Sequence, residues 1–345
     1  MSLVALVRCN EYEYGEVLEA VKKGFSLIGG ADKFAKPGET ILLKPNMLVG
    51  DLPERCSTTN PLVFRAVAEV LSSTNATLTF GDSPGFGQPE MVARRTGIME
   101  VAESMQISLA DFINGQNIQS SQAKQNKYFY IANGVLTADG IISLPKMKTH
   151  GFARISGSVK NQFGCIPGFR KAEYHALIPD LHPFSKMLVD LNMFLHPRLY
   201  IMDGILAMEG NGPRGGKPYP MRVLLFSADP VALDATFCRM IALNPTLVPT
   251  NVYGQKAGLG VYLEREIQLV GDPLDNFIKP RFHVNRDKGR AIKLPGSGKW
   301  IRNRIIPKPA IQKVKCKRCG ICISVCPVTP KALGWQDTKH ILPPR

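Results

Sequence analysis

The stretch TILLKPN, from Thr40 to Asn46, is an apolar run that ends in polar residues. Its middle shows no alternation of polar and apolar side chains, which is typical of a strand covered on both faces in a parallel sheet. Most of six further β-rich runs share this character: VALVRC (4–9), ATLTFGDS (76–83), GIISLPK (140–146), RLYIMDG (198–204), RVLLFSADP (222–230) and IQLVGD (267–272). These seven runs predict the strands of the fold.

Amphipathic stretches with helix start and stop signals fill the gaps between these runs. Residues 14–30 end on a Gly pair, residues 60–73 begin at an Asn cap, and residues 229–243 begin with Asp-Pro. Strands that alternate with helices predict an α/β domain. We therefore expect residues 1–275 to form a mostly parallel sheet with helices on both faces.

The length and composition of the chain indicate an ordinary soluble protein. With 345 residues and 44% hydrophobic side chains, it can bury a sizeable core in about two domains. The apolar run near the first residue is too short for a signal peptide, and no stretch is long enough for a transmembrane helix. We expect a cytoplasmic protein without a membrane span.

The net charge of +15 is concentrated in one segment. Residues 279–318 contain 14 Lys and Arg against one acid, whereas the rest of the chain carries 29 bases and 27 acids. Residues 276–314 are also rich in Pro and Gly, and they predict a basic linker that lies along the α/β domain or grips an acidic partner. This linker has no known nucleic-acid motif, so we disfavour nucleic-acid binding.

The sequence CKRCGICISVCP, residues 316–327, has the ligand spacing C-x2-C-x2-C-x3-C-P of bacterial ferredoxins. It predicts a small 4Fe-4S module over residues 315–345. The predicted metal ligands are Cys316, Cys319, Cys322 and Cys326. A zinc site is the alternative, and the length and regularity of the run disfavour it.

A single run leaves the fourth ligand of the cluster open. In two-cluster ferredoxins the first three cysteines of a run bind one cluster and the fourth binds the other. Cys326 binds the same cluster, or a distant cysteine such as Cys165 does, or a second run follows in a missing C-terminal piece. We favour the missing piece, and expect one cluster from this chain and a second only if the C-terminus is truncated.

Polar residues gather where several predicted strands end. They are Lys44 and Asn46, then Lys146, Lys148 and His150, and finally Lys160 and Asn161. Ligands of open α/β sheets bind beyond the carboxyl ends of the strands, so these side chains predict a site for a carboxylate or phosphate. The alternative is that each lysine is the solvated end of a strand.

Two glycine-rich stretches and a few reactive side chains add to this site. GDSPGFGQPE (81–90) follows a strand and opens a helix, as an anion-binding turn does. In MDGILAMEGNGPRGG (202–216) we expect Asp203 to end a strand, with Glu209 and Asn211 in a loop that binds the ligand. His150 and Lys148 are the catalytic candidates, His150 as an acid or base near neutrality.

Six stretches in this order, LLKPN, GDSPG, LPKMKTH, SVKNQFG, DGILAMEGNGPRGG and SADPVALDA, followed by CKRCGICISVCP, resemble the family labelled domain of unknown function 362. Members of this family are often fused to ferredoxin-type 4Fe-4S modules, usually with two cysteine runs, and this chain departs from that pattern. The resemblance implies an iron-sulfur protein and no particular substrate.

The functional expectation combines the cysteine run with the polar strand ends. The cluster would transfer electrons to or from an anionic ligand or partner held by the α/β domain, as in a 4Fe-4S oxidoreductase. The alternative is a non-catalytic electron-carrier subunit or scaffold that docks to a partner oxidoreductase. An electron carrier is expected as partner in either case.

Overall fold

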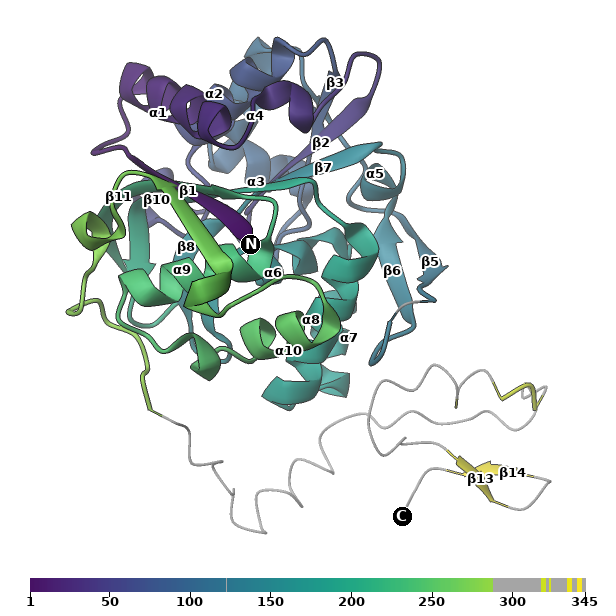
Figure 1. Cartoon of the computed structure of the whole chain (residues 1–345). Helices are drawn as coiled ribbons and strands as arrows, with labels where there is room; N and C mark the ends of the chain where they lie inside the picture. The colour runs from purple at the N-terminus through teal and green to yellow at the C-terminus, as the bar shows by residue number, and fades with distance from the viewer. Residues whose placement is uncertain (122, 288–317, 321–322, 324–333, 337–339, 343–345) are drawn as a thin grey trace.

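The computed structural model describes residues 1–121, 123–287, 318–320, 323, 334–336 and 340–342. In these residues ten strands form one sheet, in the order β12-β1-β11-β10-β7-β2-β3-β4, with β8 bonded to β10 and to β9. Helices cover both faces of this sheet (Figure 1). The α/β prediction is therefore confirmed.

All seven predicted strands are present. The strands of the main path are β1 (Ser2–Arg8), β2 (Thr40–Pro45), β3 (Thr77–Phe80), β4 (Ser108–Leu109), β7 (Gly140–Leu144), β10 (Leu199–Glu209), β11 (Lys217–Ser227) and β12 (Ile267–Gly271). β11 runs antiparallel to both of its neighbours, β1 and β10. The other neighbours on this path are parallel, so the sheet is mostly parallel, as predicted.

The helices form two layers, one on each face of the sheet (Figure 1). The first layer holds α1 (Tyr14–Leu27), α2 (Pro61–Ser72), α3 (Pro89–Arg95) and α4 (Ile98–Ser104), and the second holds α6 (Ser158–Asn161), α8 (Leu181–Leu195), α9 (Pro230–Met240) and α10 (Pro249–Ala257). Because strand side chains alternate between faces, Ile41 and Leu43 pack in the core of the first layer and Leu42 in that of the second.

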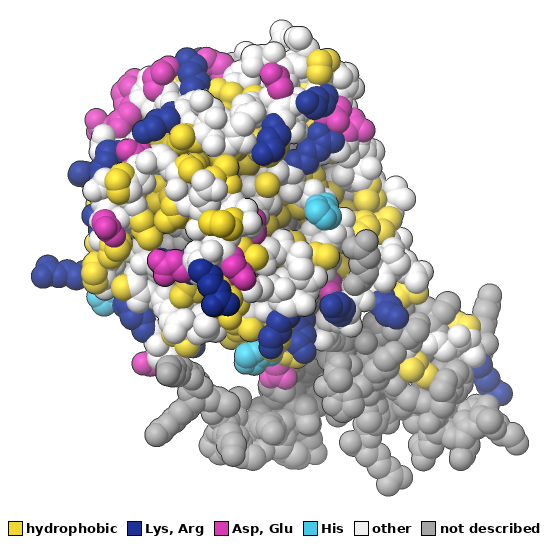
Figure 2. Space-filling view, viewed as in Figure 1, with side chains coloured by type: hydrophobic (Ala, Val, Ile, Leu, Met, Phe, Trp, Pro, Cys, Tyr) yellow, Lys and Arg dark blue, Asp and Glu magenta, His cyan; other side chains and the backbone are white. Residues whose placement is uncertain are grey.

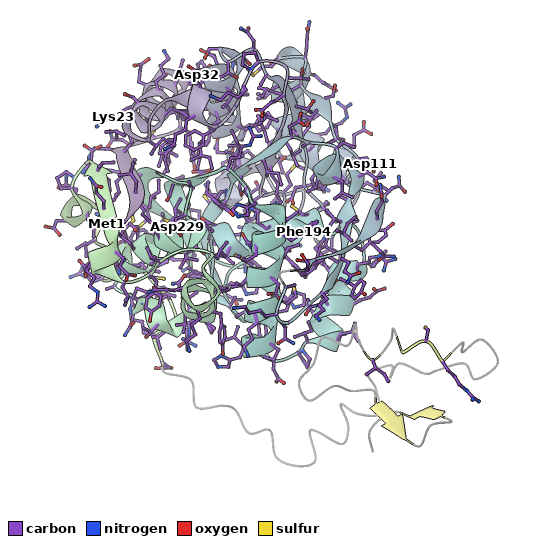
Figure 3. All side chains as sticks on the ribbon, turned by 45° about the vertical axis from the view of Figure 1, so that its right-hand side comes forward. Met1, Lys23, Asp32, Asp111, Phe194 and Asp229 are labelled. Carbon is purple, nitrogen blue, oxygen red and sulfur yellow. The ribbon has the colours of Figure 1, made fainter. Side chains whose placement is uncertain are left out.

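Side-chain caps fix where two of the predicted helices begin. The Asn60 side chain accepts a hydrogen bond from Leu62 N at the start of α2. Asp229, labelled in Figure 3, accepts from Val231 N and Ala232 N at the start of α9. Asp229 also accepts a 2.6 Å hydrogen bond from Ser2 Oγ, so one carboxylate caps a helix and holds the first strand.

One sequence prediction about a strand end is wrong. Asp203 does not end its strand: β10 continues to Glu209 because β11 pairs with it as far as Lys217. Pro145 ends β7, and Lys146–His150 form a new strand, β8, which pairs with β10 and with β9 (Arg154–Ser156).

The remaining elements are short. β5 (Gly115–Gln119) and β6 (Tyr128–Ala132) form a separate antiparallel pair, and the other α-helices are α5 (Asn133–Leu136) and α7 (Arg170–Leu177). Short 3-10 helices occur at Ala31–Lys33, Pro53–Arg55, Gln162–Cys165, Pro245–Leu247, Glu264–Glu266 and Leu274–Phe277.

The start of the expected linker packs on the α/β domain. Phe277 and Phe282 are fully buried in the core that contains α9. Residues 288–314 of that linker lie outside the described residues. Near the end of the chain, β13 (Gly334–Gln336) and β14 (His340–Leu342) form an antiparallel pair.

The charged side chains on the visible surface are of mixed sign. On the face seen in Figure 2, Lys and Arg side chains are interspersed with Asp and Glu. This distribution fits the near balance of charge outside residues 279–318.

In the part of the chain that the structure describes, no helix is long and apolar enough to cross a membrane.

Candidate anion-binding cavity

A cavity of about 780 Å³ lies beyond the carboxyl ends of β2 and β3. Its walls come from the loops that follow these strands and β4, and from α3, β8, α6 and α7. Five residues singled out in the sequence line it together: Asn46, Lys148, His150, Lys160 and Asn161. These side chains therefore surround one space, as expected for polar groups beyond the carboxyl ends of parallel strands.

A buried ion pair lies at one side of the cavity. Lys44 Nζ donates to Asp82 Oδ1 at 2.8 Å, and Asp82 Oδ2 accepts from Met47 N at 2.7 Å. Asp82 lines the cavity, whereas Lys44 lies behind it. The backbone of Gly164 passes so close that a Cβ there would lie 1.8 Å from Asp82 Oδ1. A glycine is required for this approach.

Lys148 is buried without a carboxylate partner. Its Nζ donates to Asn46 Oδ1 at 2.7 Å and to the Ser57 carbonyl oxygen at 2.6 Å. Asn46 Nδ2 donates in turn to Asn161 Oδ1, and Asn161 Nδ2 donates to Ser143 Oγ. Burial, with the charge of Lys160 nearby, lowers the pKa of Lys148 well below its ordinary value.

Two more lysines face the same space. No described residue accepts a hydrogen bond from Lys160 Nζ, which lies 5.9 Å from the centre of the Phe163 ring. Lys171 Nζ donates to Ser83 Oγ and to the Ile166 carbonyl oxygen. Burial lowers the pKa of each of these lysines to about 8. Lys171 is a cavity residue that no sequence pattern indicated.

His150 is held as a neutral imidazole. Its Nδ1 accepts hydrogen bonds from Phe152 N and Ala153 N, each at 3.1 Å. Burial, with Lys160 and Lys148 nearby, lowers the pKa of His150 to about 2. The proton is therefore on Nε2, and His150 is suited to donating a hydrogen bond rather than to the acid or base role that the sequence suggested.

Aromatic side chains form one wall. The His175 ring stacks on Phe184 with centroids 4.6 Å apart, and the Phe163 ring meets both edge to face. Burial and the nearby Lys160 lower the pKa of His175 to about 4, so this ring is also neutral. His175 lines the cavity together with Phe163.

Lys146 and Asp203 do not belong to the cavity lining. Lys146 Nζ donates to Asp203 Oδ2 at 2.8 Å and to Tyr12 Oη at 2.6 Å. Tyr12 Oη donates to Asp203 Oδ1 at 2.7 Å, and Asn60 N donates to Asp203 Oδ2. These groups satisfy one another inside the fold.

The other two predicted ligand-binding residues also lie away from the lining. Glu209 Oε2 accepts a 2.7 Å hydrogen bond from His283 N, which ties the end of β10 to the segment after Phe282. Asn211 is exposed in the glycine-rich loop. That loop instead contributes Pro213 to the cavity.

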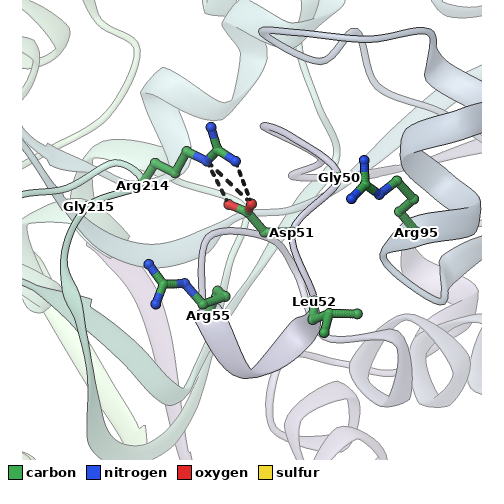
Figure 4. A pocket seen from close by; sticks show the side chains of 7 residues that line it. All are labelled: Gly50, Asp51, Leu52, Arg55, Arg95, Arg214 and Gly215. Carbon is green, nitrogen blue, oxygen red and sulfur yellow. Dashed lines mark hydrogen bonds and ion pairs between the residues drawn. The ribbon is translucent and has the colours of Figure 1, made fainter.

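A second hollow, of about 520 Å³, lies beside these loops. Figure 4 shows the Arg214 guanidinium facing the Asp51 carboxylate, with Arg55 and Arg95 around the same space. Arg214 Nη2 donates to Asp51 Oδ1 at 2.9 Å. Asp51 lies three residues after Leu48, and Arg214 directly follows Pro213. Leu48 and Pro213 both line the main cavity, so this ion pair joins two of its walls.

The cysteines of the α/β domain do not form a reactive site. Cys9, Cys56, Cys165 and Cys238 are free and buried. Burial raises the pKa of Cys165 to about 12, so this thiol is not a nucleophile at neutral pH. No group of three or more His, Cys, Asp or Glu that could hold a metal ion occurs within the described ranges.

The predicted cluster ligands lie mostly outside the described residues. These are Cys316, Cys322 and Cys326. Cys319 is described, and its thiol is free and exposed.

The fold and the cavity define an α/β protein with a lysine-lined cavity at the ends of its strands. The chain belongs to the family described as "Domain of unknown function (DUF362)", which matches residues 41–239. Every residue that lines the cavity falls within this range. The family match therefore covers the whole cavity lining.

The chain is also similar to known proteins over most of its length. It is 35% identical over 311 residues to "Thylakoid-associated protein sll1697" of Synechocystis, covering 89% of this chain and 96% of that protein.

Two solved structures are more distant. The lactate racemase apoprotein of Thermoanaerobacterium thermosaccharolyticum is 12% identical, with a TM-score of 0.46 over 70% of this chain and 57% of that one. A Thermotoga maritima protein is 11% identical, with a TM-score of 0.40 over 72% of this chain and 60% of that one.

Proposed function

We propose that the α/β domain binds an anion, a carboxylate or a phosphate, in the cavity at the ends of β2 and β3. The observation that carries this proposal is an imbalance of charge. Lys148, Lys160 and Lys171 line the cavity, and Asp82 is the sole carboxylate among the described lining residues. Lys44 already pairs with Asp82.

A bound anion would offset the cost of holding these three amines in their charged form inside the cavity. Each has a lowered pKa because burial penalises its charged form. A bound anion would stabilise the ammonium form and accept charge-assisted hydrogen bonds, each with a net contribution of roughly 1.5–3 kcal/mol. The Nε2–H group of neutral His150 would donate another hydrogen bond.

The experiment is a calorimetric titration of the full chain with sulfate and with acetate. Lys160→Met should weaken both anions by about tenfold or more, since it removes one charged donor. Lys256→Met is the matched control because Lys256 is an exposed lysine of α10 outside the cavity lining. Equal affinities for the two variants would refute the proposal.

The iron-sulfur module is a second part of the proposal, and the spacing of its four cysteines supports it. A cluster bound there would supply one-electron transfer. Iron and acid-labile sulfide should each approach about four per chain after purification without oxygen, with a reduced-cubane EPR signal. Cys316→Ser should abolish the signal and Cys165→Ala should retain it. Loss of the signal in Cys165→Ala would identify the remote thiol as a ligand.

A cytoplasmic location and an electron-carrier partner complete the proposal. The name of the Synechocystis relative says that it is thylakoid-associated. For this chain we propose a location in the cytoplasm, with any membrane association at the surface. Cell fractionation with a salt wash tests this: a surface protein is released by salt, and retention in the membrane pellet after the wash contradicts it.

A further inference from the structure

The mouth of the cavity is ringed by large apolar side chains that face water. Phe86, Met91, Ile113 and Phe169 are 79%, 50%, 62% and 89% exposed. All four line the cavity. Single exposed apolar residues are ordinary on a protein surface, but several gathered at one opening indicate an interaction site.

These side chains come from separate parts of the fold. Phe86 lies in the loop after β3, Met91 in α3, Ile113 in the loop after β4, and Phe169 immediately before α7. Folding has therefore gathered them, since no single exposed helix or strand carries them. The remaining exposed large apolar residues of the described chain are Met1, Leu52, Leu177, Leu269 and Ile278, none of which lines this cavity.

The polar groups of the cavity are less exposed than this rim. Lys148 and Asp82 are 1% and 2% exposed, and Asn161 is 3% exposed. The cavity is thus polarised, with amines and amides inside and apolar side chains at the opening. Its volume of about 780 Å³ is that of a site for a drug-sized ligand, whereas an inorganic anion fills only a small part of it.

We infer that the ligand is an amphipathic anion, with a carboxylate or phosphate head and an apolar tail. This inference rests on the proposed anion site and adds the tail. The head lies against Lys148, Lys160 and Lys171, and the tail leaves through the opening between Phe86 and Phe169. Such a tail removes the exposed rings from water, which provides affinity that a small anion does not gain.

The test is a titration of the full chain with acetate, octanoate and dodecanoate under one set of conditions. Affinity should rise along this series, by up to about fourfold for each methylene that the rim buries. Dodecyltrimethylammonium has the same tail with a cationic head, and it should not bind with comparable affinity.

Variants separate the head from the tail. Phe169→Ser should weaken dodecanoate by about tenfold and leave acetate unchanged, because an exposed ring contributes to tail burial alone. Leu177→Ser is the matched control, since Leu177 is an exposed apolar residue of α7 outside the lining. Lys160→Met should weaken both carboxylates.

The outcomes distinguish the two proposals. If acetate binds in a Lys160-dependent manner and a longer tail adds nothing, the inference is wrong and the proposed function stands. If no anion binds, both are wrong. If dodecanoate binds equally well to Phe169→Ser and Leu177→Ser, the tail does not lie on this rim and the inference is wrong.

A second arm identifies the source of the amphiphile. Sedimentation with phosphatidylcholine vesicles that contain phosphatidate should retain the chain if the ligand is a membrane lipid, and Phe169→Ser should reduce that retention. Binding of dodecanoate in solution without retention on vesicles would assign a free amphiphile. Absence of both would overturn the inference.

Discussion

Lys44 Nζ lies 2.8 Å from Asp82 Oδ1, and the two side chains are 0% and 3% exposed. This pair neutralises the sole carboxylate among the described residues of the cavity lining. Lys148, Lys160 and Lys171 are thereby left without a negative partner there. The ion pair thus helps to make the cavity a site for an added anion.

Removing one partner of this pair should destabilise the fold. We expect Lys44→Met to lower the free energy of unfolding by about 3–5 kcal/mol, because Asp82 stays buried without a counter-charge. The double variant Lys44→Met/Asp82→Asn should recover most of the loss, since the amide can still accept from Met47 N. Urea denaturation measures all three proteins. A single variant as stable as the parent would contradict this prediction.

Gly164 is expected to be intolerant of a side chain. A Cβ at this position would lie 1.8 Å from Asp82 Oδ1 and 2.9 Å from Lys44 Nζ. Gly164→Ala should therefore lower the free energy of unfolding by about 1–3 kcal/mol. It should also weaken sulfate binding. At Gly151 the nearest atom to a Cβ is 3.8 Å away. Gly151→Ala is the control and should change stability by less than about 0.5 kcal/mol.

Anion affinity should depend on the protonation of two lysines. Burial lowers the pKa of Lys160 and Lys171 to about 8. Each is charged below that value, so sulfate affinity should fall as the pH rises through about 8. Sulfate keeps its own charge over this range. Lys160→Met should show lower affinity and a shallower fall, and an affinity that stays constant from neutral pH to well above 8 would argue against these lysines.

A buried carboxyl away from the cavity should make stability depend on pH. Burial raises the pKa of Asp234 from 3.8 to about 7, although Ser158 N and Val159 N donate to it. The folded state then holds this proton more tightly than the unfolded state. Its contribution is fully present below pH 3.8 and is lost as the pH rises to about 7, by up to about 4 kcal/mol.

Urea denaturation of the parent and of Asp234→Asn across this pH range measures that contribution. The amide cannot ionise, so the difference in unfolding free energy between the two proteins should change steadily up to about pH 7 and then level off. A difference that is independent of pH would show that Asp234 ionises normally in the folded state.

The strands and several residues of the cavity could be predicted from the sequence. TILLKPN shows both a covered strand and its polar end, because burial on two faces removes alternation and the next residues meet solvent or ligand. Asn46 directly follows this strand and hydrogen bonds to Asn161, which lies in α6. The parallel order of β7, β2 and β3 accounts for this success.

The other features of the cavity could not be predicted, because they depend on contacts between residues far apart in the sequence. Lys146 and Lys148 share a strand, yet β10 bulges between their pairing partners, Asp203 and Met208, and the two lysines have different partners. Lys171 lies in α7, whose sequence shows a polar helix and nothing of the cavity.

The most direct test of the anion site is a crystal structure of the full chain with selenate bound. The anomalous signal of selenium locates the anion without reference to its shape. We predict a selenium peak in the lysine-lined cavity, with selenate oxygens within hydrogen-bonding distance of Lys160 and Lys171, and no such peak in Lys160→Met crystals. A selenium peak at the arginine hollow beside Asp51, with none in the lysine-lined cavity, would contradict it.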